Sequence, residues 1–218
     1  MGYPEDIKNI IFDLGGVVID LDRSKAVAAL SALGIPDVNT LLGLYRQEGA
    51  FFKLETGHCS ASEFFDCLRR MAVDAGAEAP TCRQIDKAFG EFLLGIPIQR
   101  LRRLRELREA GYRVYALSNT NPVMFHSQIA EFFRSEGLQT RDYFDGMVLS
   151  FEEGTCKPDE KIFQRLLRRY ALEPEHTLML DDGPANCEAA RKAGMKALQV
   201  ELPGGRDMMR ITDDLLRS

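Results

Sequence analysis

Short apolar runs recur along the chain, and each of them is too short to be a helix. They cover residues 7–13, 113–118, 147–150, 177–181 and 196–200. Between the later runs, apolar side chains recur with helical spacing, as at Leu101, Leu104 and Leu107. Strands that alternate with helices predict an α/β fold in which a doubly wound parallel sheet is connected by right-handed crossovers.

About a hundred residues separate the first run from the second, with no clear strand between them. A simple crossover needs far fewer residues, so this distance indicates an insertion. Its apolar residues follow helical spacing in four groups. The groups are Val27, Leu30 and Leu33; Leu41, Leu44 and Tyr45; Phe64, Phe65, Leu68 and Met71; and Ile85, Ala88, Phe89 and Phe92. We predict an α-helical cap domain over residues 22–96, inserted into a core domain of residues 1–21 and 97–218.

Polar residues stand at the carboxyl ends of three predicted strands. Asp13 ends the first run, and Ser118 and Asn119 lie at the end of the second. Asp181 and Asp182 lie at the end of the fourth. Because such ends share one edge of a doubly wound sheet, where ligands bind, we expect these side chains to converge on one site.

The overall charge limits what can bind there. The chain has 218 residues, of which 45% are hydrophobic and 28% charged, typical of a folded globular protein. Its net charge of −5 and pI of about 5.4 leave no basic footprint for nucleic acid. An anionic substrate would be weakly repelled, so its site needs a metal ion or a positioned lysine.

The composition also indicates the compartment. The five cysteines are odd in number and form no C-x-x-C pair, which favours a reducing environment. No apolar stretch approaches the length of a membrane span, and no signal sequence is recognisable. We expect a cytoplasmic protein with no membrane partner, either a monomer or a homodimer.

One charged run does not indicate a site. Its five arginines alternate with the leucine stripe of one predicted helix, so we expect a solvated helix face. They are Arg100, Arg102, Arg103, Arg105 and Arg108.

Two further motifs explain how the predicted site could gain positive charge: a lysine, and a pair of acids that could bind a cation. Lys157 lies in a loop and is fixed by a following proline at a predicted helix start. Asp181 and Asp182 repel each other unless a cation lies between them and a third carboxylate, and Mg²⁺ is the natural cation for such ligands. Gly15 and Gly16, after the first strand, let the backbone approach a ligand or metal closely.

Taken in order, Asp13, Ser118, Lys157 and the pair Asp181 and Asp182 resemble the four motifs of the haloacid dehalogenase superfamily. The resemblance covers essentially the whole chain and implies a Rossmann-like core with a C1-type helical cap. Local sequences are similar to the branch that holds bacterial sugar-phosphate phosphatases, such as the glucose-1-phosphate phosphatases. They are residues 12–17, 117–121, 157–159 and 54–57.

The resemblance implies a Mg²⁺-dependent phosphatase that acts on a small phosphate ester, such as a sugar phosphate. Asp13 would attack phosphorus and form an aspartyl phosphate. Mg²⁺ would be held by Asp13, the Gly15 carbonyl and Asp182, with Asp181 acting through water.

The resemblance also assigns the phosphate contacts. Ser118 and the Asn119 amide would bind phosphate oxygens, and Lys157 would neutralise both the phosphate and the nucleophile. Asp13, Ser118 and Lys157 are thus the implied catalytic residues.

The sequence departs from the family's phosphatases at position 15, where they usually carry a second aspartate as proton donor. Gly15 cannot transfer a proton. General acid catalysis contributes roughly 10²–10⁴ in rate, while phosphate-ester hydrolysis can be accelerated by up to about 10²¹, so most of the effect would remain. The sugar-phosphate branch tends to share this gap. Asp20 or Asp22 could replace the acid, although each also fits a solvated surface aspartate.

Substrate choice would rest with the cap, where Arg46, Phe52 and Glu55 are candidates. Three other functions compete. A phosphomutase needs the acid that position 15 lacks. A 2-haloacid dehalogenase needs no metal, whereas the acidic pair retains one. The third is a non-catalytic or regulatory protein with a degenerate site.

Overall fold

Five parallel strands form the central sheet of the computed structural model, which describes residues 6–43, 45–201 and 205–217. Their order is β5-β4-β1-β6-β7. They are β1 (Asn9–Phe12), β4 (Arg113–Ser118), β5 (Gly146–Leu149), β6 (Thr177–Asp181) and β7 (Lys196–Gln199). All five predicted strands are found, with ends shifted by at most two residues. The predicted doubly wound α/β fold is confirmed.

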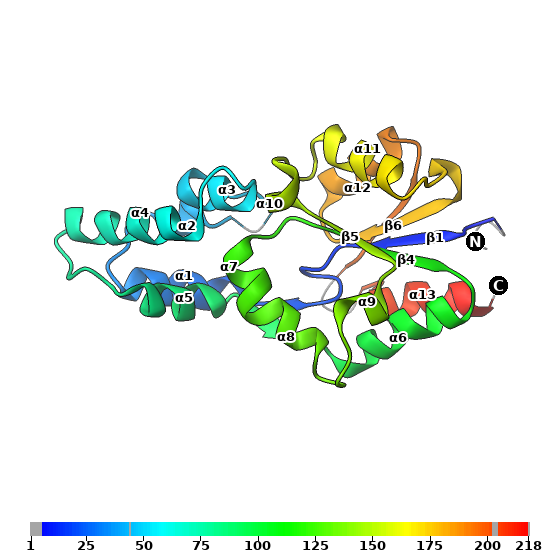
Figure 1. The fold of residues 1–218 in the computed structure, drawn as a ribbon, viewed down its shortest axis with the longest axis horizontal. Coiled ribbons are helices and arrows are strands. Elements are labelled where there is room, and N and C mark those ends of the chain that lie inside the picture. Colours follow the sequence, from blue (N-terminus) through cyan, green and yellow to red (C-terminus); the bar gives the residue numbers. More distant parts are fainter. Residues whose placement is uncertain (1–5, 44, 202–204, 218) are drawn as a thin grey trace.

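Different helices cover the two faces of the sheet (Figure 1). One face carries α11 (Glu160–Arg169) and α12 (Pro184–Lys192). The other carries α6 (Ile98–Glu109), α9 (Thr140–Tyr143) and α13 (Met208–Arg217).

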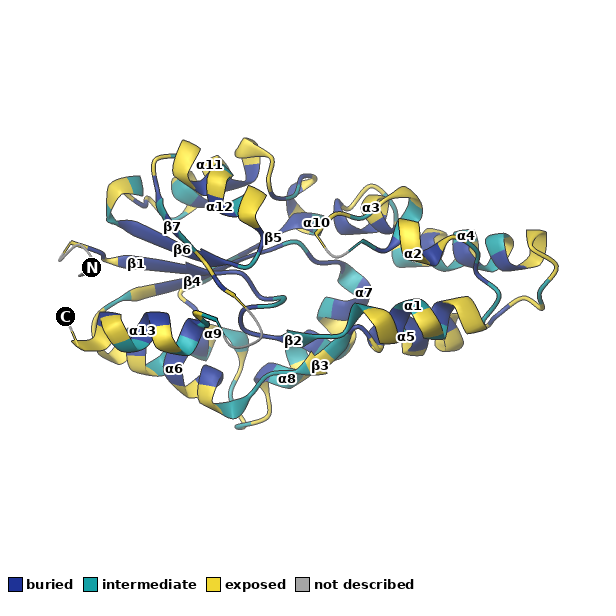
Figure 2. Cartoon of the chain, turned by 180° about the vertical axis from the view of Figure 1, so that it is seen from behind, coloured by how far each residue is buried: buried dark blue, intermediate teal, exposed yellow. Residues whose placement is uncertain are grey.

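Successive side chains along β1 pack against opposite faces of the sheet. Ile11 belongs to the apolar cluster that includes Phe163 of α11, whereas Ile10 belongs to the cluster that includes Leu104 of α6. The central strands β1, β4 and β6 are therefore buried along nearly their whole length, as Figure 2 shows, and the polar residues Asp13 and Ser118 lie at strand ends.

A group of helices lies beyond one end of the sheet (Figure 1). They are α1 (Arg23–Ala32), α2 (Val38–Leu41), α3 (Gly49–Glu55), α4 (Ala61–Asp74) and α5 (Cys82–Gly90). Phe51, Phe64 and Phe89 join three of these helices, with ring centroids 5.1–5.5 Å apart. This apolar cluster is continuous with one face of the sheet. The division into cap and core at residues 22 and 96 stays a prediction.

Two short strands correct the expectation that none lies between the first two runs. β2 (Asp20–Leu21) pairs antiparallel with β3 (Leu93–Gly95), apart from the main sheet. Strands of two and three residues leave no periodicity in a sequence, which is why they escaped prediction. They lie side by side where the chain enters and leaves the helical group.

The apolar spacing at 41–45 does not continue a helix. α2 ends at Leu41, and Leu42 instead bridges to Gln47 across a turn that contains Gly43, a poor helix former. Leu44 lies outside the described residues.

Strand β4 leads into a helical stretch with three parts. They are α7 (Pro122–Met124), a π-helical turn (Phe125–Ile129) and α8 (Ala130–Phe133). After β5 comes the short helix α10 (Ser150–Glu153), and a 3₁₀ turn (Pro174–His176) precedes β6.

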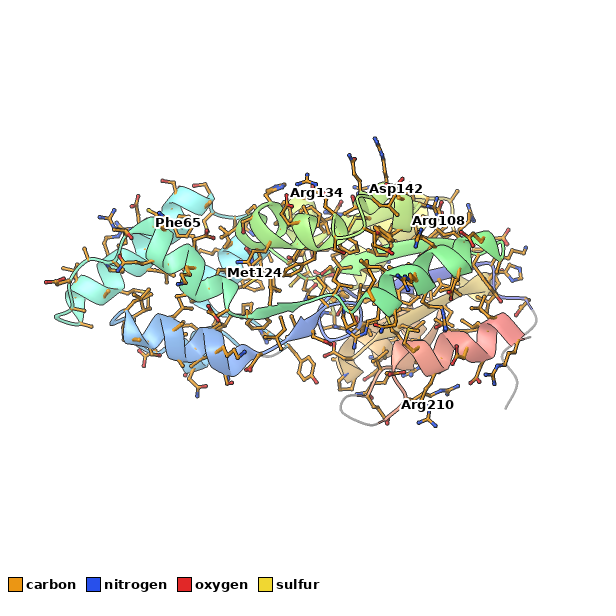
Figure 3. The ribbon with its side chains drawn as sticks, turned by 90° about the horizontal axis from the view of Figure 1, so that it is seen from below. Phe65, Arg108, Met124, Arg134, Asp142 and Arg210 are labelled. Atoms are coloured by element: carbon orange, nitrogen blue, oxygen red, sulfur yellow. The ribbon has the colours of Figure 1, made fainter. Side chains whose placement is uncertain are left out.

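Three arginines of α6, namely Arg100, Arg103 and Arg108, bind neighbouring elements rather than forming a merely solvated face. Arg100 and Arg103 are buried, and each forms an ion pair at 2.7 Å, with Asp20 and Asp213 respectively. Figure 3 shows Arg108 beside Asp142 of α9, whose carbonyl oxygen accepts from the guanidinium at 2.7 Å. The expectation was wrong for these residues because neighbouring elements bring acceptors that a single helix pattern does not reveal.

None of the helices in the described part of the chain combines the length and the apolar character needed to cross a membrane.

Candidate active site

Asp13 stands directly beyond β1, the middle strand of the sheet. Its N–H donates to the Leu180 carbonyl at 2.9 Å, which extends the pairing with β6 and fixes the start of the following turn. The carboxylate Oδ1 accepts from the Leu14 N–H at 2.7 Å. A strand-end position thus orients Asp13 before any ligand binds.

Lys157, from the loop between α10 and α11, lies between two carboxylates. Its Nζ donates to Asp13 Oδ2 at 2.9 Å and to Asp181 Oδ2 at 2.6 Å, and its side chain is fully buried. Burial alone would lower the pKa of Lys157, but the charges of Asp13 and Asp181 outweigh it and raise the pKa. Lys157 is therefore a permanent cation that holds the Asp13 carboxylate in place.

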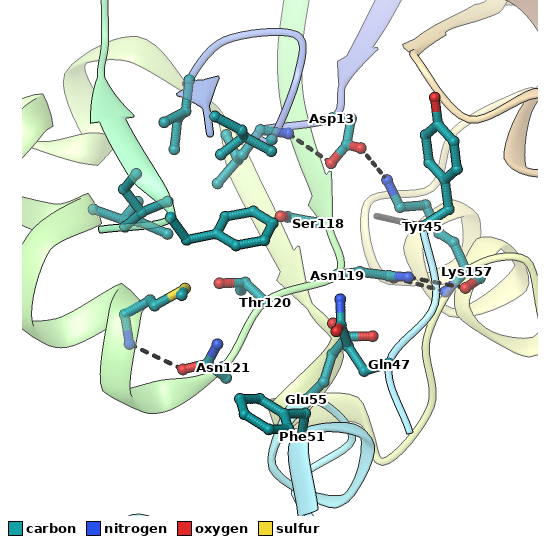
Figure 4. A pocket seen from close by; sticks show the side chains of 18 of the residues that line it. Asp13, Tyr45, Gln47, Phe51, Glu55, Ser118, Asn119, Thr120, Asn121 and Lys157 are labelled. Carbon is teal, nitrogen blue, oxygen red and sulfur yellow. Dashed lines mark hydrogen bonds and ion pairs between the residues drawn. The ribbon is translucent and has the colours of Figure 1, made fainter. Parts of the chain in front are cut away.

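Asn119 fastens the loop that carries this lysine (Figure 4). Its side-chain Nδ2 donates to the Lys157 carbonyl at 2.9 Å, and its Oδ1 accepts from the Lys157 N–H at 2.8 Å. The side-chain amide is thereby engaged, so the group that Asn119 offers a ligand is its backbone N–H. Ser118 is 2% exposed and lines the same cavity as Asp13.

The two adjacent acids have different surroundings. Asp181 uses its second oxygen, Oδ1, to accept from the Gly183 N–H at 2.8 Å and from Asn186 Nδ2 at 2.9 Å. Asp182 is only partly buried and lines the cavity. Carboxylate oxygens of Asp13, Asp181 and Asp182 lie within 4.8 Å of one another. Oxygen ligands so grouped fit one Mg²⁺, and the hydrogen bonds of Asp181 suit a contact through water.

Lys157 does not balance all of this negative charge. Burial and the neighbouring Asp181 raise the pKa of Asp182 to about 6. The pKa of Asp13 is also raised. Burial is the main cause, the charges of Asp181 and Asp182 add to it, and the attraction of Lys157 opposes it. A bound divalent cation would relieve this repulsion.

The turn after Asp13 brings backbone against this acidic cluster. Gly16 has a φ of 72°, and a Cβ at that position would lie 2.5 Å from Asp182 Oδ2. Gly16 is the glycine that permits the close approach. Gly15 does not have a positive φ, and a Cβ there would meet Leu21 Cδ1 at 3.0 Å. Position 15 therefore faces the cavity wall formed by Leu21.

A cavity of about 100 Å³ connects these groups with the helical insertion. Apolar residues of the insertion form part of its wall, including Phe51 and Phe89. Its polar lining from the insertion consists of Tyr45, Gln47 and Glu55. An adjoining cavity of about 540 Å³ shares Tyr45, Glu55, Lys157 and Asn186 with the first.

The three cap candidates are placed unequally. Glu55 is buried and lines both cavities, whereas Arg46 and Phe52 line only the adjoining one.

The two acids that could have replaced the missing proton donor, Asp20 and Asp22, form other interactions. Asp20 pairs with Arg100, and the Asp22 side chain caps α1 by accepting from the backbone N–H groups of Ser24 and Lys25.

Sequence reasoning missed Asn186, Gln47 and Tyr45. Asn186 lies in the first turn of α12, where the helix start brings it back to Asp181, and its spacing of five residues from that acid was the available signal. Gln47 and Tyr45 lie in an irregular turn of the insertion, where periodicity indicates nothing.

Comparison with known proteins identifies a family that covers most of the chain. The model of haloacid dehalogenase-like hydrolases matches residues 7–194. A D-ribitol-5-phosphate phosphatase from Bacteroides thetaiotaomicron is 37% identical over 195 residues, which make up 89% of this chain and 92% of the relative.

Solved structures show the same likeness. A haloacid dehalogenase family enzyme from Bacteroides thetaiotaomicron, in complex with magnesium and inorganic phosphate, matches with a TM-score of 0.84 and 32% identity. The match covers 94% of this chain and 98% of the other. An L-2-haloacid dehalogenase from Xanthobacter autotrophicus, at 18% identity and a TM-score of 0.60 over 96% and 88% of the two chains, shares the fold alone.

Proposed function

Because the chain belongs to the haloacid dehalogenase-like hydrolases, we propose that it is a Mg²⁺-dependent phosphatase of a small polyol or sugar phosphate, with Asp13 as covalent nucleophile. The family and the phosphatase relative confirm two of the predictions made from sequence: the superfamily, and a phosphoric monoester hydrolase rather than a non-catalytic protein. The glucose-1-phosphate branch stays a prediction. The observation that carries the mechanism is the buried Asp13–Lys157–Asp181 arrangement at the end of the sheet.

Asp13 attacks phosphorus as its carboxylate, and the alcohol leaves as the new acyl-phosphate bond forms. The Leu14 N–H and Lys157 hold one oxygen each, which fixes the carboxylate while a lone pair faces the cavity. Water then hydrolyses the aspartyl phosphate and restores Asp13. Fixed orientation of this kind lowers the barrier because little has to reorganise in the transition state.

Lys157, Ser118 and the Asn119 N–H surround the space where the transferred phosphoryl group lies. Lys157 offsets its charge, and Ser118 Oγ and the Asn119 N–H donate hydrogen bonds to its oxygens. The protein has a net charge of −5 and so does not attract an anionic substrate as a whole. Lys157 and these hydrogen-bond donors supply the attraction locally.

Asp13, the Gly15 carbonyl and Asp182 would hold Mg²⁺, with Asp181 behind them. When bound, the ion supplies electrostatic stabilisation of the negative charge on the phosphoryl oxygens. The grouping of three carboxylates around one lysine supports this assignment, since one lysine cannot neutralise three acids.

The substrate class rests on the cavity and on the relative. The cavity is small, and its insertion side mixes aromatic rings with the polar groups of Gln47, Tyr45 and Glu55. Aromatic faces and a few hydrogen-bonding groups suit a short hydroxylated carbon chain. The relative named a D-ribitol-5-phosphate phosphatase supports a polyol or sugar phosphate.

The dehalogenase alternative is the less favoured one. A dehalogenase needs no metal ion, whereas the three carboxylates grouped here suit one, and the match to the dehalogenase structure extends to the fold alone. The two activities separate in one assay, because chloride release from 2-chloropropionate should not occur here and phosphate release should require Mg²⁺.

Asp13→Asn tests the proposal. The amide keeps the size and shape of the side chain but cannot attack phosphorus, so kcat should fall by a factor on the order of 10⁶, as for the loss of a nucleophile in other covalent enzymes. Phosphate release from 4-nitrophenyl phosphate and from ribitol 5-phosphate, with thermal unfolding as the control for folding, measures the effect. A folded Asp13→Asn variant with wild-type rates would end the mechanism.

A further inference from the structure

The proposed function leaves one chemical requirement unassigned. A sugar or polyol hydroxyl is a poor leaving group, and its departing oxygen needs a proton. Gly15 cannot give one, Asp20 is paired with Arg100, and Asp22 caps α1. Among the described residues that line the small cavity, the carboxyl groups are those of Glu55 and of Asp13 and Asp182 at the strand ends.

Glu55 is the last residue of α3 and is 7% exposed. Figure 4 shows it directed from α3 into the cavity, on the side of Asn119 and opposite Asp13. The leaving oxygen of an ester attacked by Asp13 lies on the far side of phosphorus, because the displacement is in line. A substrate whose phosphorus lies against Asp13 would therefore direct its leaving oxygen towards the side of the cavity that Glu55 lines.

The Glu55 carboxyl group makes no hydrogen bond or salt bridge with the described residues. A buried acid without such a partner ordinarily destabilises a protein. Glu55 lines the cavity, so a ligand bound there can supply the missing hydrogen-bond partner. Gln47 is similar, since its Oε1 is buried without a hydrogen-bond partner and it lines the same cavity. The two groups could together meet the hydroxyls of one small substrate.

We propose that Glu55 of the insertion is the acid that protonates the leaving oxygen, in place of the aspartate that position 15 lacks. This inference rests on the proposed function. As the bond between phosphorus and the leaving oxygen breaks, its electron pair takes the proton of the Glu55 carboxyl, and the Asp13–phosphorus bond forms. A water molecule then attacks the aspartyl phosphate and gives its proton to the Glu55 carboxylate, which restores both acids.

The protonation of Glu55 agrees with this role. Burial raises the pKa of Glu55 to about 7, against the attraction of Lys157. A general acid is most effective when its pKa lies near the working pH. Other titratable or charged residues that line the two cavities around Glu55 are Asp13, Tyr45, Arg46, His58, Cys156, Asp159 and Asp182.

Glu55→Gln tests the proposal, because glutamine keeps the shape and the hydrogen-bonding capacity but transfers no proton. Three substrates are compared with Mg²⁺ present: glycerol phosphate, propyl phosphate and 4-nitrophenyl phosphate. We expect kcat/KM to fall by roughly 10²–10⁴ for both alkyl esters and by less than about threefold for the aryl ester, whose leaving oxygen needs no proton.

Each other outcome decides against the proposal. Equal losses on all three substrates mean that Glu55 only maintains the site. A loss confined to glycerol phosphate means that Glu55 binds substrate hydroxyls without transferring a proton. If the wild type is active, Asp13→Asn is inactive and Glu55→Gln is unchanged, this inference fails while the proposed function stands. A wild type that hydrolyses none of the three with Mg²⁺ overturns both.

Two measurements exclude a merely structural effect. For propyl phosphate, kcat/KM of the wild type should fall as pH rises through about 7, because Glu55 loses its proton, and Glu55→Gln should lack this limb. Adding Gly15→Asp to Glu55→Gln should restore part of the alkyl activity, since position 15 has an ordinary φ and lines the same cavity. The atom that a Cβ there would meet at 3.0 Å, Leu21 Cδ1, is the end of a flexible side chain and can move aside. A double variant without recovery and an unchanged pH limb in Glu55→Gln would overturn the assignment.

Discussion

Lys157 forms ion pairs with two carboxylates, so its loss should affect the site differently from the loss of a metal ligand. Removing Lys157 leaves Asp13 and Asp181 buried without their shared cation. Removing Asp182 takes away a candidate ligand and part of the negative charge. The two changes should therefore act in opposite directions on a bound cation.

We predict that Asp182→Asn weakens Mg²⁺ binding by more than about tenfold, whereas Lys157→Met does not weaken it. Lys157→Met should instead lower the free energy of unfolding of the metal-free protein by about 3–5 kcal/mol, as expected when one partner of a buried ion pair is lost. Calorimetric titration with Mg²⁺ and denaturant unfolding measure the two quantities. A larger loss of Mg²⁺ affinity in Lys157→Met would contradict the ligand assignment.

For single residues, the sequence was most informative where a polar side chain follows or ends a predicted strand. Asp13, Ser118 and the acidic pair are polar residues that directly follow or end apolar runs, so their convergence could be predicted. Asn186 and Gln47 could not, because their place depends on how a helix start and an irregular turn pack against the sheet. Arg46 and Phe52 prove to line only the adjoining cavity.

The junction of α3 with α10 positions Glu55 relative to the sheet. Gly57, two residues after Glu55, packs against the backbone of Phe151 in α10. A Cβ at Gly57 would lie 2.1 Å from the Phe151 carbonyl oxygen. Backbone cannot move aside as a flexible side chain does, so a larger residue must displace the end of α3.

We predict that Gly57→Ala lowers kcat/KM for propyl phosphate by up to about a hundredfold, the effect of a displacement of about 1 Å in a catalytic group. Gly76→Ala is the matched control, because Gly76 also has a positive φ, 84° against 67°, but no atom within 4 Å of the added Cβ. Both variants should lose stability through backbone strain, and only Gly57→Ala should lose activity. Equal kinetics in the two variants would contradict the role given to this contact.

Among the elements, length decided what the sequence could predict. The five strands of the sheet leave runs long enough to recognise, and α6 and α11 show a clear stripe of apolar residues. β2 and β3 are too short to leave a pattern, and their pairing is a product of tertiary structure. The helix expected around Leu41 stops because the chain turns back to form the Leu42–Gln47 bridge.

For the molecule as a whole, the acidic site links folding stability to pH and to Mg²⁺. Burial and Asp181 raise the pKa of Asp182 from 3.8 to about 6. The folded protein therefore binds more protons than the unfolded chain between these values. Without Mg²⁺, this group makes stability fall as pH rises through that window.

We predict that Mg²⁺ reverses this loss. At a concentration a hundred times its Kd, Mg²⁺ should add about 2.7 kcal/mol, which corresponds to a rise in Tm of about 5–10 °C at pH 8. The rise should be much smaller at pH 5, where protons compete for Asp182. Thermal unfolding at several pH values, with and without Mg²⁺, measures the difference, and Asp182→Asn is the control. A rise in Tm that is independent of pH in the wild type would contradict the prediction.

The β2–β3 pair has a consequence for the history of such proteins. The inserted chain leaves the core after β2 and returns to it at β3, and these two strands are neighbours. The order of the strands in the main sheet therefore does not depend on the segment between β2 and β3. Lengthening a closed loop is also cheap, at about 0.6 kcal/mol for each doubling. Evolution can therefore exchange or enlarge the segment between β2 and β3 as a cassette. New substrate preferences can arise there while the strand-end carboxylates and Lys157 remain under separate selection.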